Sequence, residues 1–144
     1  MNDRERGLLH DVASDTRFEL EIERVPAVGV AAVRGLGARA RFLSVPEGGV
    51  AQPRLFVEDT RWEPLVVERV VCAGSPPLLE WFASGDPRDG AILLLQSDRR
   101  RFGRFVFHRG RPARWWGPEL DAHGNWVALE ALEIVHEGVV WQDA

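Results

Sequence analysis

Alternation of apolar and polar residues along the chain predicts a mainly β protein. Phe18, Leu20 and Ile22 stand at every second position with charged residues between them, as in a strand with one buried and one solvated face. Further apolar or alternating runs are separated by glycine and proline, which interrupt strands. These runs predict strands over residues 27–33, 38–42, 55–57, 64–72, 91–95 and 102–107.

The stretch from residue 38 to residue 72 is expected to run out and back. Pro46, Glu47, Gly48 and Gly49 supply its turn, because glycine and proline favour tight turns. The runs 91–95 and 102–107 flank the exposed segment 97–101, which predicts a β-hairpin. Residues 112–118 are bounded by prolines, which cannot donate to a ladder, so a short piece at an edge or corner is expected there.

One short helix is predicted over residues 75–84. Ser75 is a good N-cap, and Pro76 suits the first helical position because its missing N–H has no partner there. Gly85, followed by Asp86-Pro87, ends the helix. Three apolar residues are expected on one side: Leu78, Trp81 and Phe82.

The last third of the chain has two interpretations from periodicity. An apolar stripe from Val127 to Val135 has helical spacing, and its alanines, leucines and glutamates favour helix. The alternation of Val127, Leu129 and Ala131 equally suits a long strand with a bulge near Glu130. The residues alone leave helix and strand open.

Composition is that of a single globular domain covering residues 1–144. Residues 1–16 lack apolar periodicity and are expected to form a flexible or partner-ordered arm. The net charge of −4 argues against a general nucleic-acid binder, and no run approaches the roughly 20 apolar residues of a membrane span. Cys72 lies in an apolar run, which predicts a buried thiol, and no intrachain disulfide can form. We expect the protein to be made and folded in the cytoplasm.

Candidate chemistry is sparse. Asp121, His123 and Asn125 are residue types of an acid/base site, but a polar turn is the favoured interpretation because no nucleophile accompanies them. The four histidines show no ligand spacing, and no glycine pattern matches a phosphate loop. We therefore expect no catalytic residues, no metal and no cofactor.

One basic cluster begins at Arg99-Arg100-Arg101 and is interleaved with phenylalanines. Solvated or subunit-contacting arginines are favoured over a grip on single-stranded nucleic acid, given the acidic net charge. Six tryptophans and no tyrosine also suggest packing surfaces, in the core or between subunits.

Two carboxy-terminal blocks, Pro112–Ala122 and Val127–Gly138, resemble the signature of the phage tail-tube protein family. The shared features are Pro-x-x-Trp-x-Gly-Pro, a polar loop and a strand closing with His-Glu-Gly. Matches in the same order extend over about residues 17–138. The family's amino-terminal Asn-Pro-Phe-like opening is missing, and Leu55-Phe56-Val57-Glu58 stands where its Leu-Pro-Gly segment is expected.

This resemblance implies an antiparallel β-sandwich or small barrel with one flanking helix. It also implies a non-enzymatic subunit of a contractile tail or phage tail-like injection particle. Hexameric rings would stack into a hollow tube for payload, with other tube rings, a sheath protein and baseplate or spike proteins as partners. DNA would be a partner only in a virus tail, and a membrane is not expected for the isolated subunit.

The resemblance also suggests where the contacts lie. The bore or the ring-to-ring contacts would involve Arg39, Arg41, Glu47, Gly48, Gly49, Glu58 and Asp59. The subunit interface would involve Trp115, Trp116, Arg99, Arg100 and Arg101. Three alternatives stay open: a tube-initiating or baseplate-adaptor ring, a small-molecule-binding β-barrel with tryptophans lining its pocket, and an enzyme built on Asp121 and His123.

Overall fold

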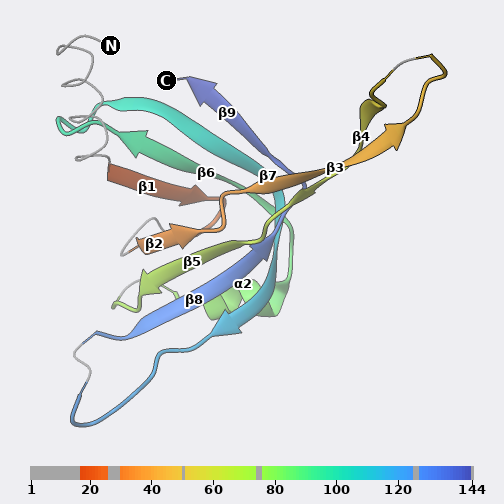
Figure 1. Cartoon of the computed structure of the whole chain (residues 1–144). Helices are drawn as coiled ribbons and strands as arrows, with labels where there is room; N and C mark the ends of the chain where they lie inside the picture. The colour runs from red at the N-terminus through yellow and green to blue at the C-terminus, as the bar shows by residue number, and fades with distance from the viewer. Residues whose placement is uncertain (1–16, 26–29, 50, 74–75, 125–126, 144) are drawn as a thin grey trace.

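The computed structural model describes residues 17–25, 30–49, 51–73, 76–124 and 127–143, and within them the chain is antiparallel β with one helix (Figure 1). This confirms the predicted fold class. The strands are β1 (Arg17–Ile22), β2 (Val30–Arg34), β3 (Ala38–Val45), β4 (Arg54–Trp62), β5 (Leu65–Val70), β6 (Arg88–Leu95), β7 (Arg101–Trp116), β8 (Leu129–Val135) and β9 (Val139–Asp143), and the helix is α2 (Leu78–Ser84).

Strand β7 joins two half-sheets. Up to Gly110 it pairs with β6 on one side and, over Gly103–Phe107, with β9 on the other, and β1 extends this first half-sheet beyond β6. From Arg111 to Trp116 it pairs with β8, which is followed by β5 and β2 in the second half-sheet. The predicted 91–95/102–107 hairpin is confirmed as β6–β7. The piece at 112–118 lies at an edge as expected, but most of it is the end of a 16-residue strand.

The carboxy-terminal third is strand rather than helix. The β5–β8 register runs without interruption from Leu65↔Ile134 to Val70↔Leu129, so the predicted bulge near Glu130 is wrong. The register shift instead lies between β7 and β8, at Pro112/Arg114. The bulge was expected from the alternation of Val127, Leu129 and Ala131, whereas the buried face of β8 carries Glu130.

A kink at His136–Gly138 separates β8 from β9, and both strands pair with β7. The Glu137 N–H donates to the His108 carbonyl at 3.0 Å, and the His108 N–H donates to the Gly138 carbonyl at 3.3 Å. Gly138 has φ +131°, a conformation that favours glycine. The kink therefore continues the ladder while it turns the chain from one half-sheet to the other.

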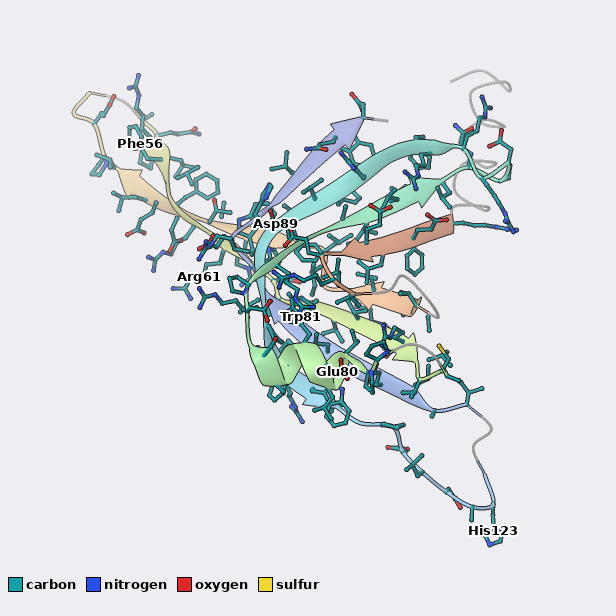
Figure 2. The ribbon with its side chains drawn as sticks, turned by 180° about the vertical axis from the view of Figure 1, so that it is seen from behind. Phe56, Arg61, Glu80, Trp81, Asp89 and His123 are labelled. Carbon is teal, nitrogen blue, oxygen red and sulfur yellow. The ribbon has the colours of Figure 1, made fainter. Side chains whose placement is uncertain are left out.

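The core lies between the half-sheets and beneath α2. Its buried residues include Leu20, Ile22, Ile92 and Phe107 from the first half-sheet and Leu65, Val67, Leu132 and Ile134 from the second, with Leu78 and Trp81 from the helix. Figure 2 shows Trp81 at the helix face that meets the sheet. Phe82, predicted on the same side, is 40% exposed, and Cys72, predicted as buried, is only partly so.

Helix α2 begins later than predicted. Its N-cap is Pro77 and its first residue is Leu78, so Pro76 precedes the helix; Ser75 lies outside the described residues. The end is as predicted, because Gly85 has φ +66° and its N–H donates to the Trp81 carbonyl. Just beyond, the Ser84 hydroxyl and then Arg88 donate to the Asp86 carboxylate and lower its pKa to about 2.

A buried carboxylate explains the helix start. Glu130 on β8 accepts a hydrogen bond from the Leu78 N–H at 2.8 Å, lies 3.2 Å from the Arg69 guanidinium and accepts from the Trp115 indole at 3.1 Å. Arg69 also donates to the Pro76 carbonyl. The side chains of Arg69 and Glu130 are 2% and 0% exposed. The first N–H groups of a helix have no partner within the helix, and a capping side chain usually accepts a hydrogen bond from one of them. Here the Glu130 carboxylate takes that place, and its negative charge also suits a helix N-terminus.

Replacing Glu130 tests this arrangement. Glu130→Gln should lower the free energy of unfolding by about 3 kcal/mol, because it removes the negative charge that lies 3.2 Å from the buried Arg69 guanidinium. The measurement is urea unfolding followed by circular dichroism. Glu133→Gln, on the opposite face of β8, is the matched control and should change stability by less than about 0.5 kcal/mol. Equal losses in the two variants would contradict the assigned role.

Candidate assembly surfaces

Strands β3 and β4 form a separate two-stranded hairpin that projects from the body of the molecule (Figure 1). The register runs from Ala38↔Trp62 at the base to Val45↔Arg54 near the tip. Gly48 and Gly49 form a turn at the tip, as predicted, and Gly49 has φ +83°. Residues 59–61, expected between two strands, lie within β4.

The base of the hairpin is charged. Arg41 lies 3.1 Å from Glu58 and 3.4 Å from Asp59, and Arg39 lies opposite Arg61. Glu58 is the extra residue of a bulge at Arg41/Phe42. The structure thus gathers Arg39, Arg41, Glu58 and Asp59 on one element. Glu47 is nearer the tip, where it pairs with Arg54 at 3.4 Å.

The outer part of the hairpin is apolar on both faces. Directly opposed residues share a face, so Phe42 and Val57 lie on one side and Leu43 and Phe56 on the other. Their exposed fractions are 55%, 61%, 51% and 50%, and Figure 2 shows Phe56 far from the core. An isolated two-stranded hairpin is marginal in water, and exposed apolar patches mark contact sites. This hairpin therefore has the character of a docking element.

The sequence held a signal for this surface that the strand predictions did not use. Leu55, Phe56 and Val57 are consecutive and apolar, so a strand containing them has an apolar residue on both faces. Such a run is usually a buried strand. Only the tertiary structure shows that it lies outside the core.

The first half-sheet has two open edges. Among the described residues, β1 pairs along its length only with β6, and β9 only with β7. Strand β9, which was not predicted, carries Val140 and Trp141, which are 50% and 42% exposed. Trp141 covers Gly103 and packs edge-on against Phe105 with ring centroids 4.9 Å apart. Open strand edges can pair with another chain.

The candidate acid/base residues form a turn. The Asp121 carboxylate accepts a hydrogen bond from the His123 N–H at 2.9 Å, the pattern of an Asx-turn. His123 lies at the far end of a projecting loop (Figure 2), and Asn125 falls outside the described residues. No group of three metal-binding side chains occurs in the part of the chain that the structure describes. The geometry supports the turn interpretation.

The tryptophans do not share a pocket in the described parts of the chain. Trp81 is in the core, Trp62 lies against Gly138, and Trp126 is outside the described residues. The enclosed hollow beside Leu20 and Arg69 holds only about 10 Å³. Ligand pockets usually measure roughly 300–1,000 Å³, so the interior offers no support for a ligand-binding barrel.

Comparison with known protein families gives a match over most of the chain. Residues 14–140 match the family of the T4-like virus tail tube protein gp19. The chain belongs to that family. The resemblance predicted from the carboxy-terminal blocks is confirmed, and no curated protein sequence matches the chain.

Solved structures with low sequence identity share the tail tube fold. A chain of the extracellular contractile injection system PVC sheath–tube complex in its extended state matches with a TM-score of 0.80 and 15% identity, over 100% of this chain and 99% of that one. A chain of the anti-feeding prophage baseplate matches with a TM-score of 0.71 and 22% identity, over 88% and 93%. Hcp1 from Flavobacterium johnsoniae matches with a TM-score of 0.57 and 15% identity, over 88% and 95%.

In this tail tube protein the predicted interface residues do not form one patch. Trp115 and Trp116 stand at one end of β7 and Arg99–Arg101 at the other. Trp115 packs against the core, whereas Trp116 lies under Arg114, whose guanidinium carbon is 4.4 Å from the centroid of the Trp116 ring.

No helix in the described segments is long and apolar enough to span a membrane.

The arginine end of β7 is a tight turn. Arg99 has φ +65°, and the Arg100 N–H and guanidinium both donate to Asp98, at 3.0 and 2.5 Å. The backbone hydrogen bond from Arg100, together with its side chain, holds the pKa of Asp98 below its usual range. Arg101 reaches the carboxylates of Glu19 and Glu21 on β1, at 3.8 and 3.5 Å. All these side chains are exposed, as expected for solvated or subunit-contacting groups.

The packing of the Trp141 ring over Gly103 can be tested directly. Gly103→Ala should lower the free energy of unfolding by about 1–3 kcal/mol, because a Cβ at Gly103 would lie 2.1 Å from the Trp141 ring. Amide hydrogen exchange should show the loss first in β9. Gly48→Ala is the control, since a Cβ there meets nothing within 4 Å. Unchanged β9 protection in Gly103→Ala would show that Trp141 does not hold this strand in place.

Proposed function

We propose that the protein is the inner-tube subunit of a contractile phage tail-like injection particle. Its copies form hexameric rings, and the rings stack into a hollow conduit for payload. The observation that carries this proposal is a pair of unsatisfied surfaces on one tail tube fold: a half-sheet with two open edges and a hairpin that is apolar on both faces. The protein acts by assembly and carries out no reaction.

Ring closure follows from the open edges. Strand β9 of one copy presents its free edge to β1 of the next, which joins the first half-sheets of the two copies. Because the two edges differ, the contact is head-to-tail, and a head-to-tail contact with a suitable rotation closes into a ring. Trp115 and Trp116, and the turn Arg99–Arg101, are the proposed flanking contacts between subunits.

Ring stacking uses the hairpin. Its outer half meets apolar surface on a neighbouring ring, with the Gly48-Gly49 turn at the leading end. The charged base, with Arg39, Arg41, Glu58 and Asp59, borders the bore or the next ring, and Glu47 extends this charged margin toward the tip. Apolar burial supplies most of the contact energy, while the charges set register and exclude wrong partners.

The proposed partners follow from the assemblies in which similar folds occur. Those structures are a sheath–tube complex and a baseplate, so a sheath protein and baseplate or spike proteins are proposed beside other tube rings. Assembly takes place in the cytoplasm of the producing bacterium, within a virion or phage tail-like particle. DNA is a payload only in a virus tail.

A second candidate is the tube-initiating or baseplate-adaptor ring of the same particle. The similarity to a chain of a baseplate, at 22% identity, favours it as the alternative. Both candidates use the same subunit surfaces. They differ in whether one ring or many are built from this chain.

Electron microscopy of the purified protein tests the proposal. Rings or tubes of uniform bore are expected for the wild type, and long tubes would select the main-tube role over a single adaptor ring. Phe56→Asp should keep the wild-type melting temperature but abolish tubes, because a charge would enter an apolar contact. Leu120→Asp, at an exposed apolar site off the hairpin (83% exposed, against 50% for Phe56), should still form tubes. A wild type that stays monomeric at high concentration would refute the proposal.

Charge reversal at the hairpin base tests the second contact. Arg39→Glu combined with Arg41→Glu should leave the fold intact, because surface ion pairs contribute only about 0–1 kcal/mol. Tubes should shorten or dissociate into rings, and raised salt should reduce the difference from wild type by screening. Light scattering across salt concentrations measures both effects. Arg104→Glu is the control on the first half-sheet; tubes of unchanged length and salt response in the double variant would remove the base from the stacking contact.

A further inference from the structure

The hairpin is joined to the body by a narrow neck, formed by residues 35–37 on one side and Glu63-Pro64 on the other. The Glu63 N–H donates to the Gly37 carbonyl at 3.0 Å, and pairing with the body resumes at Arg34↔Val66. The two segments of the neck pass very close together, since a Cβ on Gly35 would lie 2.0 Å from the Pro64 carbonyl oxygen. These two short backbone segments act as a hinge between the hairpin and the body. By themselves they do not fix the angle at which the β3–β4 hairpin leaves the body.

His136 supplies a third attachment at this pivot. Its Nε2 lies 2.9 Å from the Glu63 carbonyl oxygen, which can only accept, so Nε2 carries the hydrogen. Its Nδ1 lies 3.1 Å from the Gly138 nitrogen, whose N–H donates to it. One neutral tautomer therefore satisfies both bonds. The imidazole spans from the kink between β8 and β9 to the last residue before Pro64.

Aromatic contacts fix the same ring. Trp62, the last residue of β4, lies 6.0 Å from the imidazole between ring centroids and rests on Gly138, where an added Cβ would come within 3.3 Å of its Nε1. On the body side the imidazole meets Phe107, which is 1% exposed, at 6.3 Å. His136 thus stands on a buried core residue and holds the base of an exposed ribbon.

We propose that His136 is a positioning residue that sets the angle of the β3–β4 hairpin and keeps it projecting before any partner is met. The functional consequence of this inference rests on the proposed tube function: a hairpin that is already aligned loses less conformational entropy when it docks on a neighbouring ring. It also assigns a role to the His-Glu-Gly sequence: histidine latches the hairpin, glutamate continues the ladder, and glycine lets Trp62 approach.

Spin-label distances within one chain test the latch. Labels at Gly48→Cys, on the hairpin tip, and Glu80→Cys, on the outer face of α2, report the hairpin angle in a Cys72→Ser background (Figure 2 shows Glu80). Diluting labelled protein with unlabelled protein restricts the measurement to distances within one chain. A narrow distance distribution is expected for His136. His136→Ala should widen it at least about twofold, because a lost hydrogen bond of ordinary strength shifts such an equilibrium by up to roughly tenfold.

Two further variants and one spectrum separate positioning from general stability. His136→Gln should restore much of the narrow distribution, since its amide can both donate to Glu63 and accept from Gly138. His108→Ala, on the adjoining strand, is the control and should leave the distribution unchanged. Nitrogen-15 shifts of the wild type should show the Nε2–H tautomer. If His136→Ala fails to fold, the comparison of His136→Gln with wild type and the observed tautomer still decide whether His136 positions the hairpin.

A distribution as narrow in His136→Ala as in wild type, a failure of Gln to narrow it, or an Nδ1–H tautomer would overturn the inference. If the latch is correct, His136→Ala should also raise the concentration needed for tube formation by about tenfold. The two proposals fail separately. A wild type that forms no rings refutes the tube function, while the distance comparison within the chain still decides the role of His136.

Discussion

One buried carboxylate connects most of the structure. Glu130 meets Arg69 of β5, the first N–H of α2 and the indole of Trp115 on β7, so four elements converge on two oxygen atoms. Removing a carboxylate from water is unfavourable unless it is paired with a cation and accepts hydrogen bonds. The arrangement consequently fixes the position of the helix on the second half-sheet and the register of β8 against β5. A hydrocarbon side chain at this position would fill the volume without fixing either.

The body built around Glu130 carries both of the proposed assembly surfaces. Strand β7 is long enough to serve both half-sheets. In the first half-sheet, β1 pairs along its length only with β6 and β9 only with β7 among the described residues, so each has an open outer edge there. The hairpin continues from β2 and returns into β5, so its base belongs to the second half-sheet. The two surfaces are therefore held by different halves of one core.

Much of the body could be predicted from the sequence, because local patterns of apolar and polar residues indicate strands such as β1, β6 and the start of β7. The end of α2 was likewise set locally by Gly85. Glu130 misled the prediction, since a charged residue in the core can be recognised only together with Arg69, which is far away in sequence. The residues that the family resemblance assigned to the bore or the ring contacts include Arg39, Arg41 and Glu58, which lie together on the hairpin, and their role there stays a prediction. The separation of Trp115 and Trp116 from Arg99–Arg101 was not predicted, because it depends on the length of β7.

The two apolar faces of the hairpin have a kinetic consequence. A neighbour with a flat surface covers only one face of a two-stranded ribbon, so a pair of such subunits leaves the other face in water. In the proposed tube, burial becomes complete only where a second neighbour is already in place. The first few contacts are then weak, and an existing end binds a new subunit more tightly than two free subunits bind each other. Growth would therefore be limited by nucleation, and the number of tubes in a cell would be set by the supply of starting structures.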